Sequence, residues 1–373
     1  TYSTDKQVPD SASTATAFLC GIKTKFQMIG VSARTKHQDC ESVFGNEVSS
    51  ILQWAQVAGK DTGIITTARV THATPAASYA HTPYRNWESD ENKPENASRC
   101  KDIARQLVED DPGRNIKVSL FEYSHMQYEI ERNKEDNGEP SIAEMTEKAI
   151  NILQKNPKGF FLLVEGGRID HAHHESTAKK ALEDTLAFEE AVERAVLLTN
   201  QKDTLIVVTA DHSHVLTING YPDRGNPILG IADISDVDHM PYTTLMYTNG
   251  RGFRRTVDGN RFNLTGVDTT ADNYVQLAGV PKRDETHGGE DVAIYANGPM
   301  SHLFHGVHEQ NYIAHVMAYA ACVGSNKNHC RTRDYATAST LKSSVPNNGL
   351  IHIEFIVLII SGVFISTTHY RSY

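Results

Sequence analysis

Residues 160–176 read FFLLVEGGRIDHAHHES, so an apolar run leads directly into a dense group of carboxylates and histidines. Carboxylate and imidazole groups are common protein ligands of zinc and related ions. Asp170 and His174 are four residues apart, where a strand would give way to a helix, and one ion could contact both. A polar loop with incidental histidines is the alternative, but the density of ligand types favours a metal site.

Two more polar clusters follow apolar runs in the same way. Asp211 and His212 come directly after TLIVVTA, and His72 and Thr74 come after GIITTARV. In open α/β sheets, ligand sites lie beyond the carboxyl ends of the strands. We therefore expect the three clusters, distant in sequence, to meet at one edge of a sheet.

The residue types indicate which ions the clusters would hold. Carboxylates with imidazoles suit zinc, whereas Glu165 and the Thr74 hydroxyl suit a harder ion such as magnesium. Two metals about 3.5–4 Å apart can clamp the attacking and leaving oxygens of a phosphoryl group. Ser11, in VPDSAST near the first residue, is a candidate nucleophile, although an Asp-Ser pair is a weak motif by itself.

Composition narrows the class of protein. The 373 residues carry a net charge of −10 without a basic patch, so a nucleic-acid partner is not expected. The five cysteines form no CxxC pair, which argues against a cysteine zinc site. The sequons at Asn96 and Asn263 predict glycosylation and suit a secreted protein.

Apolar runs and helical periodicity define the elements that must position these residues. Strands are expected at 63–70, 159–165, 204–210, 242–247 and 292–296, and helices at 97–108, 175–200 and 309–322. The alternation predicts an α/β fold with a central, mostly parallel sheet flanked by helices on both faces.

Three changes in composition divide the chain. Residues 216–285 are rich in Gly, Pro, Asp and Asn, which predicts a small β-rich insertion between two parts of the core, 1–215 and 286–334. Residues 335–373 read as a polar spacer and an apolar tail, shorter than the ~17–25 residues of a spanning helix. This arrangement is typical of a GPI-anchor signal. The alternative is a final buried strand.

Six strings of the chain resemble the animal alkaline phosphatases, especially the membrane-anchored type, from residue 1 to about residue 330. They are TYSTDKQVPDSASTAT, THATPAASYAHTPYRNW, GFFLLVEGGRIDHAHHES, TADHSH, DETHGGEDVAIYANGP and IAHVMAYAAC. The resemblance implies an alkaline phosphatase-like fold and hydrolysis of a broad range of phosphate monoesters. VPDSAST together with ETHGGED argues against a phosphodiesterase or sulfatase on the same fold.

The resemblance also implies roles for individual residues. Ser11 would carry the phosphoryl group as a phosphoserine intermediate, and Arg85 would clamp two phosphate oxygens. The implied ligands are Asp170, His174 and His287 for a first zinc, Asp211 and His212 for a second zinc, and Thr74 and Glu165 for one magnesium. His72, His171 and His214 would lie around these ligands.

Further implications concern the rest of the molecule. Phe121 (through its carbonyl), Glu122 and Glu139 would form part of a calcium site. Disulfides would join Cys40 to Cys100 and Cys322 to Cys330, leaving Cys20 free. Residues 216–285 would correspond to the family's crown, near the axis of a homodimer, and a GPI anchor would hold the protein on the extracellular face of the plasma membrane.

The chain departs from the family pattern in three places. An aspartate that bridges the second zinc and the magnesium lies on a strand upstream of TYSTD, which this sequence does not contain. Residues 109–119 (EDDPGRNIKVS) replace several dozen residues, and Ser13 replaces a glycine. Loss of an anionic ligand weakens metal sites, so a catalytically impaired, anchored surface glycoprotein of the same fold is the alternative function.

Overall fold

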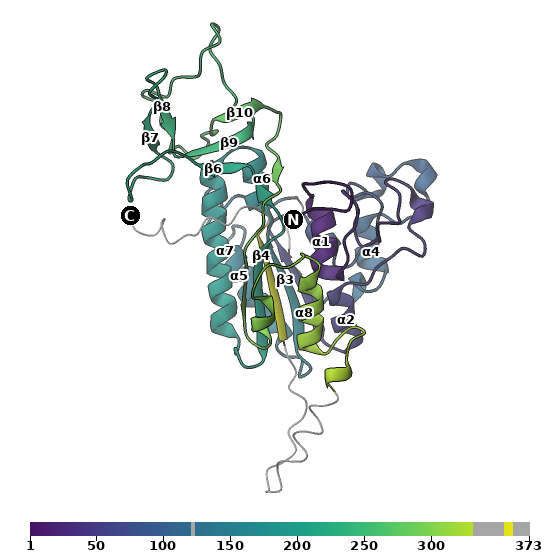
Figure 1. The fold of residues 1–373 in the computed structure, drawn as a ribbon. Helices are drawn as coiled ribbons and strands as arrows, with labels where there is room; N and C mark the ends of the chain where they lie inside the picture. Colours follow the sequence, from purple (N-terminus) through teal and green to yellow (C-terminus); the bar gives the residue numbers. More distant parts are fainter. Residues whose placement is uncertain (121–123, 331–353, 361–373) are drawn as a thin grey trace.

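The computed structural model describes residues 1–120, 124–330 and 354–360 (Figure 1). Its centre is a six-stranded sheet with the strand order β12-β4-β13-β3-β1-β2. The strands are β1 (Asp61–Thr66), β2 (Val118–Leu120), β3 (Phe160–Gly166), β4 (Thr204–Ala210), β12 (Ile294–Asn297) and β13 (Glu354–Ile360). Only β12 runs antiparallel to its neighbour. The predicted mostly parallel α/β sheet is therefore confirmed.

Helices cover both faces of this sheet (Figure 1). The α-helices are α1 (Ser11–Cys20), α2 (Ile51–Val57), α3 (Ala73–Ala76), α4 (Ile103–Glu109), α5 (Ile142–Leu153), α6 (Gly167–His174), α7 (Ala178–Leu198) and α8 (Tyr312–Ala321). The 3-10 helices are η1 (Cys40–Ser42), η2 (Asp90–Asn92), η3 (Glu95–Ala97), η4 (Gly113–Asn115) and η5 (Ser301–Phe304). The helix expected at 97–108 thus begins later, at Ile103, where Asp102 caps it.

Two apolar cores lie on the two faces of the sheet. One contains buried residues of α1, α2 and α8 together with Phe161 and Leu163 of β3. The other contains residues of α5 and α7 together with Leu162 and Val164 of the same strand. Because side chains alternate along a strand and both faces are covered, all seven residues of β3 are buried. This explains why β3 and β4 are near-continuous apolar runs in the sequence.

The apolar run near the C-terminus forms β13, in the middle of the sheet. It pairs in parallel with both β3 and β4, and Phe355–Ile359 are buried. Taking out β13 would separate β3 from β4, and the GPI-anchor signal expected in 335–373 stays a prediction. The final buried strand, left open by the sequence, is the arrangement that the structure shows. Among the described residues, no helix combines the length and apolar character needed to cross a bilayer.

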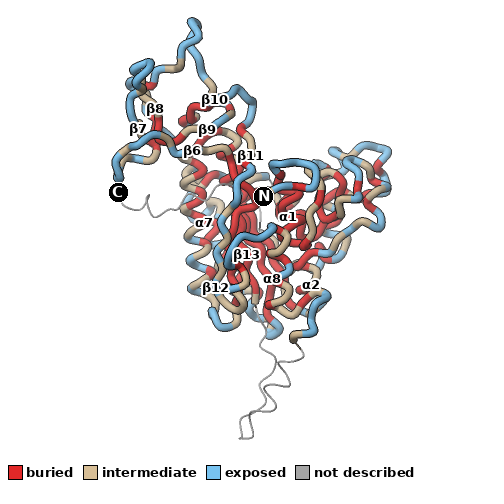
Figure 2. The backbone as a smooth tube through the Cα atoms, viewed as in Figure 1, coloured by how far each residue is buried: buried red, intermediate tan, exposed pale blue. Residues whose placement is uncertain are grey.

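Residues 216–285 form a small β-rich unit above the carboxyl ends of the central strands (Figure 1), and we call this unit the crown. Its strands are β6 (Leu216–Ile218), β7 (Ile231–Ile234), β8 (Pro241–Thr243), β9 (Leu245–Gly250) and β10 (Ala278–Pro281). They make a three-stranded sheet, β10-β9-β6, and the pair β7-β8. The strand expected at 242–247 is therefore divided at Thr244. Figure 2 shows that much of the crown is exposed, in contrast to the buried sheet below it.

Both disulfides implied by the resemblance are present. Cys40 is bonded to Cys100 and Cys322 to Cys330. Cys20 is free and buried, and burial raises the pKa of its thiol to about 12. A thiol that stays protonated and enclosed is unreactive at neutral pH.

Candidate metal centre and active site

The three polar clusters meet at the carboxyl edge of the central sheet, as the sequence predicts. α6 follows β3 directly and carries Asp170 and His174, while Asp211 and His212 follow β4. A short antiparallel pair, β5 (Ser213–His214) with β11 (His287–Gly288), brings His287 next to His214 across 73 residues of sequence. This pairing could not be foreseen from the apolar pattern.

Asp170 lies at the centre of the cluster. Its Oδ1 is 2.9 Å from Nε2 of His214, 3.4 Å from Nε2 of both His174 and His287, and 3.9 Å from Nε2 of His212. Burial raises the pKa of this carboxyl, but the surrounding histidines outweigh burial and hold it well below its usual range. Asp170 is therefore an ionised carboxylate surrounded by imidazole nitrogens.

The donor set fits a zinc ion. Ligand atoms of Asp170, His212, His214 and His287 all lie within 4.8 Å of one another. Nδ1 of His287 contacts the Pro9 carbonyl oxygen at 2.8 Å, which leaves Nε2 facing the cluster. Burial lowers the pKa of the His212 and His287 imidazoles. Neutral imidazole is the form that binds metal.

A second group of donors lies beside Ser11. The Ser11 Oγ is 3.1 Å from Nε2 of His212, which is itself 3.2 Å from Oδ2 of Asp211. This Oδ2 is buried, and no hydrogen bond of good geometry reaches it. Burial, together with the nearby Asp170 and Glu165 carboxylates, raises the Asp211 pKa well above its usual range. A cation here would satisfy the orphaned oxygen and neutralise the crowded negative charge.

Ser11 is the first residue of α1, and all ten residues of this helix are buried. Asp10 caps the helix, and its carboxylate accepts a hydrogen bond from the Ser13 backbone N–H. Thus Ser13 takes part in the cap. The first turn of a helix presents backbone N–H groups and a positive partial charge, which favour an anion beside Ser11.

Arg85 is held next to this helix start. One guanidinium nitrogen donates to Oδ2 of Asp10 at 3.1 Å, and the other donates to Nε2 of His72, also at 3.1 Å. Burial and then the Arg85 charge lower the His72 pKa well below its usual range, so His72 is a neutral acceptor. Sequence reasoning missed Asp10, which is 75 residues from Arg85 and looks like an ordinary helix cap.

The two residues predicted to bind magnesium, Thr74 and Glu165, lie on different elements. Thr74 lies in α3 and its buried Oγ1 has no hydrogen-bond partner, while the Glu165 carboxylate at the end of β3 accepts a hydrogen bond from the Thr66 hydroxyl. Oxygen donors of this kind suit magnesium. No hydrogen bond joins the Thr74 hydroxyl to Glu165. Between Glu165 and Thr209 lies Ile359 of β13, so the strand places an apolar side chain, and no carboxylate, at this position.

Three histidine rings line the other side of the site. The His171 ring centroid is 5.3 Å from that of His72 and 4.2 Å from that of His125. Burial lowers the pKa of His171 to about 3 and that of His125 to about 4, so both rings are neutral. The sequence analysis missed His125, which stands alone in a polar segment and has no motif around it.

The calcium prediction falls mostly outside the described residues, because Phe121 and Glu122 belong to 121–123. Glu139 is half-buried in the loop before α5, and its carboxylate accepts a hydrogen bond from the Gln127 backbone N–H at 2.7 Å. That contact gives no support for a cation at this position. Asn96 and Asn263, the predicted glycosylation sites, are both exposed.

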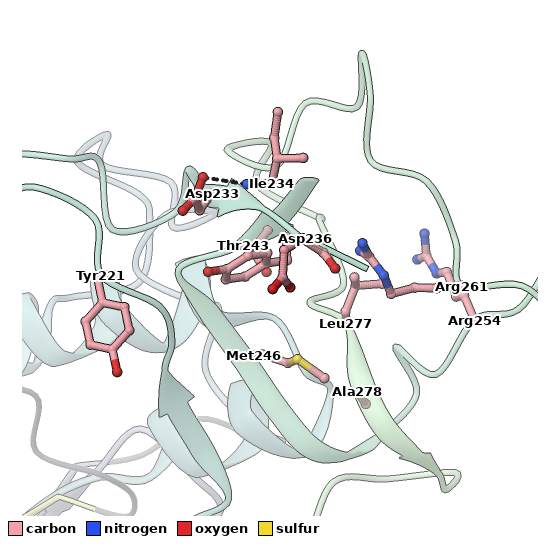
Figure 3. Close-up of a pocket in the computed structure, with 12 residues that line it drawn as sticks. Tyr221, Asp233, Ile234, Asp236, Thr243, Met246, Arg254, Arg261, Leu277 and Ala278 are labelled. Atoms are coloured by element: carbon pink, nitrogen blue, oxygen red, sulfur yellow. Dashed lines mark hydrogen bonds between the residues drawn. The ribbon is translucent and has the colours of Figure 1, made fainter. Parts of the chain in front are cut away.

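An open hollow of about 840 Å³ leads to the cluster. Its lining includes His125, Arg168, His171, His174, Glu285 and His287. A second hollow of about 620 Å³ lies in the crown, and Figure 3 shows its lining, with Asp236, Met246 and Arg254 among the labelled residues. No residue of the histidine cluster reaches the crown hollow. The cluster therefore opens to the first hollow.

The fold and the donor set define an α/β metalloenzyme with a serine beside its metal ligands. The alkaline phosphatase family model matches residues 1–120 and 110–323. The chain is 46% identical to the tissue-nonspecific alkaline phosphatase of Rattus norvegicus, over 96% of this chain and 80% of that protein. It is 45% identical to the alkaline phosphatase of Gadus morhua, over 88% of this chain and 83% of the relative. The chain belongs to the alkaline phosphatase family.

Solved structures agree with this assignment at the level of the fold. The alkaline phosphatase from the Antarctic bacterium TAB5 matches with a TM-score of 0.57 and 24% identity, over 87% of each chain. The alignment with the rat enzyme spans 429 positions, more than the 373 residues present here, so the relative has residues without counterparts in this chain. The two segments of the family match meet at 110–120, where the sequence analysis expects an internal deletion.

Proposed function

We propose that this chain hydrolyses phosphate monoesters through a phosphoserine on Ser11, releasing an alcohol and then inorganic phosphate. The observation that carries the proposal is the position of the Ser11 Oγ, 3.1 Å from Nε2 of His212 and at the first residue of α1. A nucleophile is recognised by such contact with its activating groups. Phosphomonoester hydrolysis is also the activity of the family to which the chain belongs.

The ligand roles carry over as part of the proposal. Asp170, His174 and His287 would hold a first zinc, Asp211 and His212 a second zinc, and Thr74 and Glu165 a magnesium. When bound, such ions lower the pKa of oxygen nucleophiles and neutralise charge on a phosphoryl group. His214 is closer to Asp170 than any proposed zinc ligand is, at 2.9 Å, and we assign it to orienting that carboxylate.

Arg85 would bind the phosphoryl group beside Ser11. Its two terminal guanidinium nitrogens are already held by Asp10 and His72, so little rotamer freedom remains to be lost when a phosphate arrives. Backbone N–H groups at the start of α1 would add to the stabilisation of negative charge. These contacts recognise phosphate only, and the hollow outside them is wide. A broad substrate range follows.

Assembly and location belong to the proposal as well. Exposed apolar residues of the crown, including Tyr221, Val237 and Val257, suit burial in a homodimer. The two disulfides and the exposed Asn96 and Asn263 suit an extracellular protein. A GPI anchor remains a prediction, and the central position of β13 argues against removal of that segment.

The alternative, an impaired surface glycoprotein, rests on a missing bridging carboxylate. The contacts of Ser11, Arg85 and the histidine cluster do not favour it, because the residues that would touch a phosphate lie together.

The test is hydrolysis of p-nitrophenyl phosphate at alkaline pH by the zinc- and magnesium-loaded chain. Ser11→Ala should lower turnover by at least ~10³-fold, as loss of the nucleophile does in other hydrolases. Ser301→Ala, which removes a hydroxyl outside the hollow, should leave turnover unchanged. Mass spectrometry of acid-quenched protein should detect phosphate on Ser11. Absence of both turnover and phosphoserine in fully loaded protein would overturn the proposal.

A further inference from the structure

Glu285 is a buried carboxylate directly behind the proposed zinc site. It is the last residue of the crown segment 216–285 and lies two residues before His287. Its side chain is 0% exposed. A buried carboxylate is costly unless it is hydrogen-bonded, so its contacts indicate what it does.

Both carboxylate oxygens of Glu285 are engaged by neighbouring groups. Oε2 is 2.6 Å from Nδ1 of His214, and Oε1 accepts a hydrogen bond from the Val215 backbone N–H at 2.8 Å. The other ring nitrogen of His214, Nε2, is 2.9 Å from Oδ1 of Asp170. A continuous line of hydrogen bonds thus runs from Glu285 through His214 to the carboxylate at the centre of the cluster.

The backbone of Glu285 holds a second member of the cluster. Its carbonyl oxygen is 2.6 Å from Nδ1 of His174, and its N–H donates to the His174 carbonyl oxygen at 3.0 Å. With Nδ1 bound to a carbonyl, His174 carries its proton there. Its Nε2 lone pair then points to the cluster, 3.1 Å from Nε2 of His287. One residue therefore fixes Asp170 through its side chain and His174 through its backbone.

The crown sheet fixes Glu285 in turn. Asn249 of β9 exchanges two hydrogen bonds with Thr286, and a Cβ on Gly250, at φ 140°, would lie 3.2 Å from the Glu285 Cβ. The Tyr247 hydroxyl, on the same strand, is 2.8 Å from Nδ1 of His173. β9 is therefore packed against the segment that carries Glu285 and against the helix that carries the metal ligands.

We propose that Glu285 is a positioning residue through which the crown orients Asp170 and His174 for the first zinc. The proposal rests on the function proposed above. Outer partners of metal ligands typically contribute 10–100-fold to metal affinity, because they fix the orientation and tautomer of the ligands. Direct ligation by Glu285 is the competing role, since His174, His214 and Glu285 have donor atoms within 4.8 Å of one another. The engagement of both its oxygens argues against it.

Zinc binding to the full chain, measured by competition with a chromophoric chelator, tests this without relying on turnover. Glu285→Gln should weaken the first zinc by roughly 10–100-fold and leave the number of bound ions unchanged. Glu285→Asp, which keeps the charge, should bind more tightly than Glu285→Gln, and it also serves if the Gln variant does not fold. Asp238→Asn, which removes an exposed crown carboxylate paired with Arg261, is the matched control and should bind like the parent chain.

The outcomes separate this inference from the proposed function. Parent-like zinc affinity in Glu285→Gln, or loss of one whole ion per chain, would overturn the positioning role while leaving a zinc-dependent parent chain intact. A parent chain that binds zinc but hydrolyses no phosphate monoester would overturn the proposed function. In that case a weaker first zinc in Glu285→Gln would still support the positioning role.

Discussion

Leu358 gives a sharp test of the unexpected place of the C-terminal segment. It is 0% exposed in β13, opposite Val164 of β3 and Val208 of β4. Leu→Ala substitutions at such sites cost about 3–5 kcal/mol, through lost burial and the cavity left behind. A segment that is cleaved off, or that lies outside the sheet, would contribute almost nothing.

The size of the effect on thermal unfolding follows from the chain length. At about 2.1 cal/mol/K per residue, 373 residues give an unfolding entropy of roughly 0.8 kcal/mol/K. A loss of about 3 kcal/mol should therefore lower the unfolding midpoint by about 4 °C. Leu197→Ala, at a 69% exposed position on α7, is the matched control and should shift the midpoint by less than about 1 °C.

The assay is differential scanning calorimetry of the purified chain, whose mass is checked to include residues 354–373. Equal midpoints for Leu358→Ala and Leu197→Ala would refute the central position of β13. So would a purified protein that lacks this segment and unfolds at the parent temperature.

Three further predictions concern the site, the titration of a buried acid and the disulfides. Arg85→Lys should lower kcat/KM for p-nitrophenyl phosphate by roughly 10–10²-fold, because an ammonium cannot bridge Asp10, His72 and a phosphate; unchanged kcat/KM would contradict this. Burial raises the Asp184 pKa to about 7 in the folded chain, whereas an Asp in an unfolded chain titrates near pH ~4. The stability that comes from holding this proton in the folded state is therefore fully present below about pH 4 and is lost as the pH rises to about 7. Asp184→Asn should therefore make the thermal-unfolding midpoint depend less on pH between about pH 4 and 7. An unchanged slope of the midpoint against pH would count against this prediction. Removing the Cys40–Cys100 disulfide, which spans 60 residues, should lower the free energy of unfolding by about 4 kcal/mol. Removing the Cys322–Cys330 disulfide, which spans 8 residues, should lower it by about 2.5 kcal/mol. The reverse order in denaturant unfolding would contradict the loop-entropy argument.

The sequence predicts best those elements whose burial leaves a clear pattern. β3 and β4 are continuous apolar runs because both faces of a parallel sheet are covered, and α7 shows helical spacing because one side meets the core. α1 could not be predicted in this way, because all ten of its residues are buried and its mostly small residues form no apolar stripe. The order of the strands could not be predicted either, because nothing in the residues of β13 indicates that it lies between β3 and β4.

The site shows the same division. Clusters after apolar runs predict which residues gather at the sheet edge, since the carboxyl ends of parallel strands lie together. Partners that belong to no cluster were missed. Asp10 reads as a helix cap and His125 as a lone histidine, and the link from Glu285 to Asp170 depends on the β5–β11 pairing. Such contacts depend on long-range packing, which a local pattern does not encode.

The most direct test is metal-dependent phosphatase activity of the purified chain. After removal of metal with a chelator, p-nitrophenyl phosphate hydrolysis should disappear, and it should return when zinc and magnesium are added, in the parent chain but not in Ser11→Ala. Hydrolysis that survives chelation, or that Ser11→Ala regains on adding the metals, would contradict the assignment of this cluster as the catalytic centre.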